Sequence, residues 1–212
     1  MSNYFLSMLP AEELEQLKFI PTLPEFVTWI EQKWSDLPCL SDTVNTYNYK
    51  QVCDLVARKR ALLNDLGLQK GDKVAILDNS TIEQVEMFLA VTSAGYVAIN
   101  LPAMLPPQAI VGCCMKFGVK VLVAGKNFME TVKDAPCKVI AITDCADHTA
   151  PVATVDKNDP AAIFFTGGTT GAPKGAILPH RALMRGALNG CYAPGHQLGC
   201  HRYANVLPLS HV

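Results

Sequence analysis

Residues 161–175 read AAIFFTGGTTGAPKG, in which five apolar residues run directly into ten that include four glycines, three threonines and one lysine. The apolar run is typical of a buried β-strand, and a helix is expected soon afterwards, over His180–Cys191. Glycines let backbone N–H groups approach an anion, while threonine hydroxyls and the Lys174 side chain add donors and positive charge. Since ligands of open α/β sheets bind at the carboxyl ends of strands, this stretch predicts a phosphate-binding loop.

Strands and helices alternate along the chain before this loop. Short apolar, β-branched runs follow segments of helical periodicity, which predicts an α/β fold with a parallel sheet covered by helices on both faces. Thr143–Asn158 has no periodicity and predicts a loop. The expected strands are Lys73–Leu77, Tyr96–Ile99, Val119–Val123, Lys138–Ile142 and Ala161–Phe165; the expected helices are Ala11–Lys18, Pro24–Trp34, Lys50–Leu66, one capped by Asn79, Ser80 or Thr81 and running to Ala94, one from Pro106 to Phe117, and a short one over Lys126–Val132.

Composition narrows the possible classes of protein. Of the 212 residues, 50% are hydrophobic and 17% are charged, which excludes a wholly disordered chain. A net charge of -1 provides no basic excess for nucleic acid, so no nucleic-acid partner is predicted. The uncharged run from Met87 to Met115 is divided by glycine and prolines, which favours strand, turn and helix over a membrane span and leaves at most peripheral membrane contact.

The cysteines and histidines predict no metal site. None of the eight cysteines forms a C-x-x-C pair, and no export signal precedes the chain, so reduced thiols in a cytoplasmic protein are expected. One cluster contains both types of zinc ligand within eleven residues, but its spacing matches no zinc motif. Its members are Cys191, His196, Cys200 and His201.

Two common nucleotide-binding motifs are missing from the glycine-rich stretch. It is not a Walker A loop, because Pro173 precedes the lysine and Gly175 follows it. The chain also lacks the G-x-G-x-x-G fingerprint of dinucleotide enzymes. A surface loop whose glycines only turn the chain is the structural alternative.

The stretch T-G-G-T-T-G-A-P-K-G resembles the signature loop of the adenylate-forming superfamily, which includes acyl-CoA synthetases, luciferases and the adenylation domains of peptide synthetases. The doublet Gly167-Gly168 is most similar to fatty-acyl-CoA synthetases. Two positions depart from the family pattern: Pro179 replaces a helix-capping Ser or Thr, and Ser210 replaces a frequent aromatic residue. Further similar segments follow in the family's order, at 48–52, 68–75, 93–97, 175–181 and 207–211, so the resemblance runs from about residue 22 to the last residue.

This resemblance implies that residues 1–212 are the first part of a large N-terminal AMP-binding domain, with the C-terminal domain absent. The implied reaction joins a carboxylate to ATP, giving acyl-AMP and pyrophosphate, and then forms a thioester with CoA. A fatty or similar apolar acid is the expected substrate, Mg²⁺ the expected ion, and the isolated chain is expected to be inactive. The alternatives are an adenylation domain of a non-ribosomal peptide synthetase and a non-catalytic nucleotide-binding module.

The resemblance also implies roles for individual residues. Lys174 would stabilise the charge that develops on the leaving pyrophosphate, as the catalytic residue of this segment. His211 would lie near the pocket for the acyl group. The residues expected to hold the ATP phosphates are Thr166, Gly167, Gly168, Thr169, Thr170, Gly171 and Lys174.

Overall fold

The computed structural model describes residues 21–166, 174–191, 205 and 208–210. Its centre is a six-stranded sheet in the order β6-β5-β3-β4-β7-β8. The first five of these strands run parallel, which confirms the predicted parallel sheet, while β8 joins β7 antiparallel at the edge. The strands are β3 (Lys73–Leu77), β4 (Val97–Asn100), β5 (Val119–Ala124), β6 (Lys138–Ala141), β7 (Pro160–Thr166) and β8 (Lys174–Pro179).

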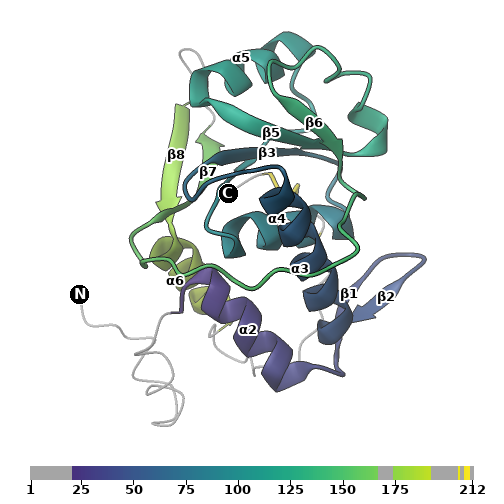
Figure 1. The fold of residues 1–212 in the computed structure, drawn as a ribbon, viewed down its shortest axis with the longest axis vertical. Helices are drawn as coiled ribbons and strands as arrows, with labels where there is room; N and C mark the ends of the chain where they lie inside the picture. The colour runs from purple at the N-terminus through teal and green to yellow at the C-terminus, as the bar shows by residue number, and fades with distance from the viewer. Residues whose placement is uncertain (1–20, 167–173, 192–204, 206–207, 211–212) are drawn as a thin grey trace.

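Helices cover both faces of the sheet, as predicted (Figure 1). The alternation of side chains along β3 explains why. Val74 and Ile76 belong to the apolar core that includes residues of α2, α3 and α4, whereas Ala75 and Leu77 belong to the core on the opposite face, with α5. The helices are α2 (Leu23–Trp34), α3 (Tyr49–Asp65), α4 (Ile82–Ser93), α5 (Pro107–Phe117) and α6 (His180–Cys191).

The helix boundaries follow local sequence signals. Asn48 caps α3, since its side chain accepts the N–H of Gln51 at 2.8 Å while the Gln51 side chain accepts the N–H of Asn48 at 2.9 Å. Thr22 and Glu25 form the same kind of capping box at the start of α2. Gly118, with φ of 63°, ends α5 in the left-handed conformation that favours glycine.

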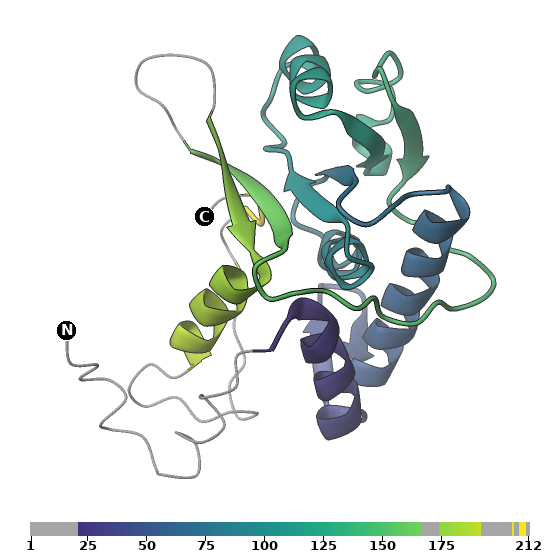
Figure 2. The same cartoon turned by 60° about the vertical axis from the view of Figure 1, so that its left-hand side comes forward.

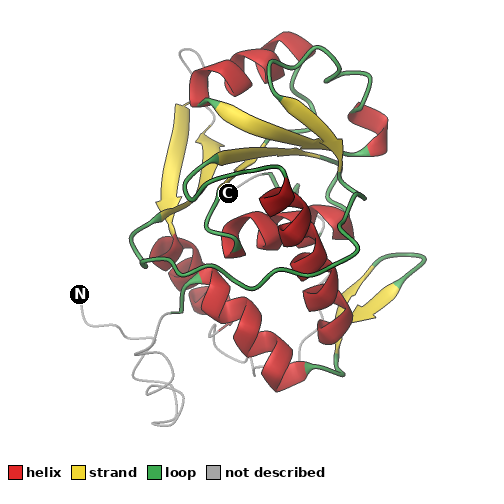
Figure 3. Ribbon diagram, in the orientation of Figure 1, coloured by secondary structure: helices red, strands yellow, loops and turns green. Residues whose placement is uncertain are grey.

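Two segments differ from the predictions, and a third lies outside the described residues. A small antiparallel hairpin, β1 (Pro38–Ser41) and β2 (Thr46–Asn48), lies beside α3 and was not predicted (Figure 3). The helix expected over Lys126–Val132 shortens to a single 3-10 turn, η2 (Lys126–Phe128). The expected helix Ala11–Lys18 lies outside the described residues. Within the part of the chain that the structure describes, no helix has both the length and the apolar character to cross a bilayer.

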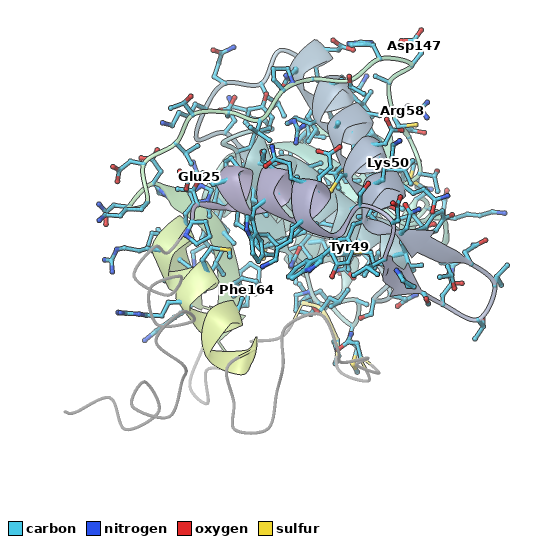
Figure 4. All side chains as sticks on the ribbon, turned by 90° about the horizontal axis from the view of Figure 1, so that it is seen from below. Glu25, Tyr49, Lys50, Arg58, Asp147 and Phe164 are labelled. Atoms are coloured by element: carbon cyan, nitrogen blue, oxygen red, sulfur yellow. The ribbon has the colours of Figure 1, made fainter. Side chains whose placement is uncertain are left out.

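Basic residues of α3 hold the predicted loop over Thr143–Asn158 against the helical layer. Arg58 donates from Nε to the carbonyl of Ala146 at 2.8 Å, and Arg60 donates twice to the carbonyl of Ala150, at 2.9 and 2.7 Å. In Figure 4, Arg58 of α3 and Asp147 of this loop lie at the same end of the molecule. The loop has no helix or strand, and these bonds explain how it keeps a defined course.

Candidate functional site

The β7–β8 hairpin brings the two ends of the glycine-rich loop together. Thr166, the last residue of β7, pairs with Lys174, the first residue of β8 (Figure 2). The Lys174 side chain is exposed at this position. Both residues therefore lie at the carboxyl end of β7, where the predicted loop begins. The predicted phosphate-binding residues Gly167, Gly168, Thr169, Thr170 and Gly171 lie outside the described residues.

Gly175 has a packing role in this hairpin. A Cβ atom at this position would lie 2.8 Å from Cγ2 of Ile163 and 3.0 Å from Cζ of Phe117. The Phe117 ring, at the end of α5, also packs edge-on against Phe165, with ring centroids 5.7 Å apart. Gly175 thus allows α5 to pack directly against the base of the loop, a role distinct from binding an anion.

The neighbouring strands also end in polar or small residues at this edge. Asp78 follows β3, Asn100 ends β4 and Gly125 follows β5. A Cβ atom on Gly125 would lie 2.1 Å from Oδ1 of Asp78, so a larger residue would have to displace this carboxylate. The hydroxyl of Thr81 donates to the other oxygen of Asp78 at 2.5 Å. The carboxyl ends of β3 and β5 are therefore packed closely around one carboxylate.

A distant segment returns to the same edge. The N–H of Leu209 donates to the Ser80 hydroxyl at 3.0 Å, and Nδ2 of Asn100 donates to the Leu209 carbonyl at 3.4 Å. The following residue, Ser210, is buried. The segment that precedes His211 is therefore bound to residues that follow β3 and end β4; His211 itself lies outside the described residues.

His180 begins α6, as expected, and is fully buried. Its Nδ1 accepts the backbone N–H of Leu23, the first residue of α2, at 3.3 Å. Burial lowers the pKa of His180 and so favours the neutral ring that can accept this bond. The contact gives His180 a structural role, since it joins α6 to α2.

Comparisons with known proteins identify the family. A model described as "AMP-binding enzyme" matches residues 27–212. The chain belongs to the AMP-binding enzyme family. Curated relatives include the 4-coumarate–CoA ligase of Pinus taeda, 29% identical over 203 residues that cover 85% of this chain. Another is non-ribosomal peptide synthetase 8 of Aspergillus fumigatus, 27% identical over 169 residues that cover 76% of this chain and 2% of the relative. The resemblance to adenylate-forming enzymes is confirmed.

Solved structures agree on the fold of this member of the AMP-binding enzyme family. The N-terminal subdomain of Klebsiella oxytoca NpsA superposes with a TM-score of 0.70 at 24% identity, covering 77% of this chain and 44% of that one. VinN gives a TM-score of 0.72 at 18% identity, with 81% and 47% covered. The anthranilate–CoA ligase AuaEII in complex with anthranoyl-AMP gives 0.70 at 18% identity, with 83% and 36% covered. The chain spans 38% of the length of the Pinus taeda ligase.

Sequence reasoning missed two polar residues at the carboxyl edge of this sheet. Asn100 was assigned to no role, although it directly ends an apolar run, Val97-Ala98-Ile99. Ser80 was considered only as a helix cap, a role that Thr81 takes. A polar residue at the end of a buried strand is the signal that could have located the edge.

The described residues provide no metal site of their own: among them, no group of three or more His, Cys, Asp or Glu side chains converges. The cluster formed by Cys191, His196, Cys200 and His201 has no side chain within the described part. Burial raises the pKa of the Cys53 and Cys114 thiols to about 12, so neither is disposed to act as a thiolate ligand.

Proposed function

We propose that this chain belongs to an ATP-dependent acid–thiol ligase. A carboxylate attacks the α-phosphorus of ATP, which forms acyl-AMP and releases pyrophosphate; a thiol then takes the acyl group and releases AMP. The observation that carries the proposal is the hairpin between β7 and β8, which pairs Thr166 with Lys174 at the carboxyl edge; these two residues flank the middle of the sequence TGGTTGAPKG. The family match and the ligases among the relatives support it.

The proposed ligand of this edge is a nucleoside triphosphate. A carboxylate and ATP repel each other, so their reaction requires neutralised charge and aligned reactants. The loop N–H groups and Lys174 would hold the β- and γ-phosphates, with Thr166 at the start of the loop. Lys174 would stabilise the leaving pyrophosphate. Mg²⁺, when bound with ATP, would supply further positive charge to the phosphates. His211 would line the pocket for the acid.

Two classes of acid are candidates. The predicted substrate, a fatty or similar apolar acid, stays a prediction. An aryl acid is the second candidate, because relatives are named as coumarate ligases and similar structures contain anthranoyl-AMP or a 3-hydroxybenzoyl analogue. CoA is the proposed acceptor, and the peptide synthetase relative supports a carrier protein as the alternative.

We further propose that the 212 residues by themselves do not complete the reaction. The relatives named as ligases are more than twice as long, since this chain covers 38% of one of them. A cytoplasmic location is proposed with reduced thiols, which agrees with the six free cysteines in the described part of the chain. No partnership with nucleic acid is proposed.

Pyrophosphate exchange tests the function on the full-length protein. The assay uses fatty, hydroxycinnamic and aminobenzoic acids in parallel, with ATP and Mg²⁺, followed by thioester formation with CoA or a phosphopantetheine carrier. Exchange that depends on one acid class would support the ligase and identify that class. Binding of ATP without exchange for any acid would favour the non-catalytic module instead.

A further inference from the structure

Two hydrogen bonds join the segment 208–210 to the carboxyl edge of the sheet. Both backbone polar groups of Leu209 are hydrogen-bonded, because its N–H donates to the Ser80 hydroxyl and its C=O accepts from the Asn100 side chain. The two partners lie more than one hundred residues earlier in the sequence, after β3 and at the end of β4. We call this contact the Leu209 clamp.

Backbone strain marks the clamp. Ser80 has φ of 56°, and among the described residues it is the only one other than glycine with a positive φ. Oε1 of Gln84 accepts the Ser80 N–H at 3.0 Å and stabilises this conformation. Strain of this kind persists where the surrounding structure requires it, and it is concentrated at functional sites.

Two buried amide atoms beside the clamp have no hydrogen-bond partner in the described structure. They are Oδ1 of Asn100, whose residue is 4% exposed, and Nε2 of Gln84, whose residue is 1% exposed. Each belongs to a side chain whose other polar atom makes a bond of the clamp or supports Ser80. Unpaired buried polar atoms are rare in native proteins and mark sites with a further role.

The position of the Leu209 clamp in the sheet indicates which reactant binds beside it. The loop that would hold the ATP phosphates begins and ends on β7 and β8, while the clamp lies on the ends of β3 and β4. Since β4 and then β3 are the neighbours of β7 in the sheet, an acid that reacts with ATP bound at the end of β7 can bind at the ends of β4 and β3. We propose that Ser80 and Asn100 are positioning residues that fix the Leu209 backbone and thereby determine how the carboxylic acid binds. This inference rests on the proposed function.

Substitutions at Ser80 test the clamp without disturbing the core, because the residue is exposed. Ser80→Gly removes the acceptor and relieves the strain at positive φ, so the protein should fold. Ser80→Asn keeps an acceptor oxygen on a residue that tolerates this φ. In the full-length protein, Ser80→Gly should raise the KM for the acid about threefold to tenfold, the effect of one neutral hydrogen bond, with the KM for ATP unchanged. The Ser80→Asn variant should have a KM for the acid close to that of the wild type.

Hydrogen exchange provides a second measurement. The amide of Leu209 should exchange faster in Ser80→Gly than in the wild type and in Ser80→Asn. Ser41→Gly, at an exposed serine in β1, is the matched control and should change neither KM nor exchange. Equal changes in the KM for the acid and the KM for ATP, or no change in the KM for the acid, would overturn the inference. The proposed function would still stand in that case, provided that the wild type catalyses pyrophosphate exchange. A wild type without pyrophosphate exchange would refute the proposed function itself, and the clamp's role in binding the acid with it.

Discussion

Lys174 is the single cation of the ten-residue stretch that begins at Thr166. Its place at the start of β8 is determined by pairing with the last residue of β7. Under the proposed function, a phosphate at this edge would meet the positive charge of Lys174. We therefore propose that this charge acts while pyrophosphate leaves and has little effect on the later thioester step.

Replacing Lys174 with alanine in the full-length protein should therefore slow formation of acyl-AMP selectively. A charge-assisted contact contributes ~1.5–3 kcal/mol, which corresponds to roughly 10–150-fold in rate. Thioester formation from preformed acyl-AMP should be nearly unchanged. Single-turnover kinetics of the two half-reactions measure both. Lys138→Ala, at the far edge of the sheet, is the control. Equal losses in both half-reactions would instead indicate a role in folding or domain positioning.

A second prediction at the residue scale concerns the contribution of Gly175 to stability. Gly175→Ala should lower the free energy of unfolding by about 1–3 kcal/mol, because its Cβ would overlap Ile163 and Phe117. Gly186→Ala is a matched control, since a Cβ there meets nothing within 4 Å and alanine favours the helix. Urea denaturation compares the two variants. A Gly175→Ala protein as stable as the control would show that the hairpin shifts freely.

At the scale of elements, α3 and α4 are joined by a buried ion pair. Nζ of Lys59 lies 3.0 Å from Oε2 of Glu86, and the two side chains are 3% and 4% exposed. Lys59 also donates to the carbonyl of Ile142 at 2.8 Å, at the start of the loop that α3 holds. Burial raises the pKa of Glu86, although Lys59 opposes this shift. The pair thus ties two helices and the loop together.

Removing one partner should be costly, because a buried charge would be left unpaired. Lys59→Met is expected to lose ~3–5 kcal/mol of unfolding free energy, and a Lys59→Met/Glu86→Leu double variant should recover most of it. A carboxyl whose folded pKa is raised above its unfolded pKa contributes stability at low pH that is lost as the pH rises. The deficit of Lys59→Met should therefore shrink as the pH falls toward the ordinary value of 4.5.

Chemical denaturation across pH measures both effects. Lys133→Met, which removes an exposed pair with Glu130, should change stability by less than about 1 kcal/mol. If the Lys59 variant behaved like this control, or if the double variant were as unstable as the single one, the ion pair would not be what joins α3 to α4.

At the scale of the whole molecule, two apolar cores lie on opposite faces of one sheet. The carboxyl edge collects residues from β3, β4, β5 and β7, together with the distant segment 208–210. Assembly of the edge therefore depends on the complete sheet order. This chain contains the carboxyl edge of the sheet, and the ligases among its relatives are more than twice as long as the chain.

A direct prediction concerns the 212 residues expressed alone. They should support no pyrophosphate exchange above that of their Lys174→Ala variant with any acid of the panel. Pyrophosphate exchange reports the formation of acyl-AMP, and we propose that this step needs residues beyond the 38% of the relative's length that this chain covers. Circular dichroism confirms that the tested chain is folded. Exchange clearly above the Lys174→Ala level would overturn this prediction and place the complete catalytic machinery within these residues.

Much of the architecture could be predicted from the sequence because the relevant signals are local. Apolar β-branched runs such as Lys73–Leu77 predict strands buried on both faces, and capping residues such as Asn48 mark where helices begin. The hairpin β1–β2 was missed because its strands have only four and three residues and are partly exposed, so they have no apolar periodicity. The glycine-rich loop was predicted from its composition and from its place between an apolar run and a helical segment, and the structure confirms that its two ends lie on β7 and β8.

The sequence by itself determined the α/β class, the alternation of strands and helices, and the position at which the chain turns after β7, because each depends on residues close together in the chain. The expected loop Thr166–Gly175 is shorter than predicted, since Thr166 belongs to β7 and Lys174 and Gly175 belong to β8. Only the tertiary structure decided the strand order, the packing of Phe117 against Gly175, and the Leu209 clamp. These depend on contacts between residues far apart in sequence, such as Ser80 and Leu209. Such contacts form only when both segments reach the same edge of the sheet, and no local pattern encodes that meeting.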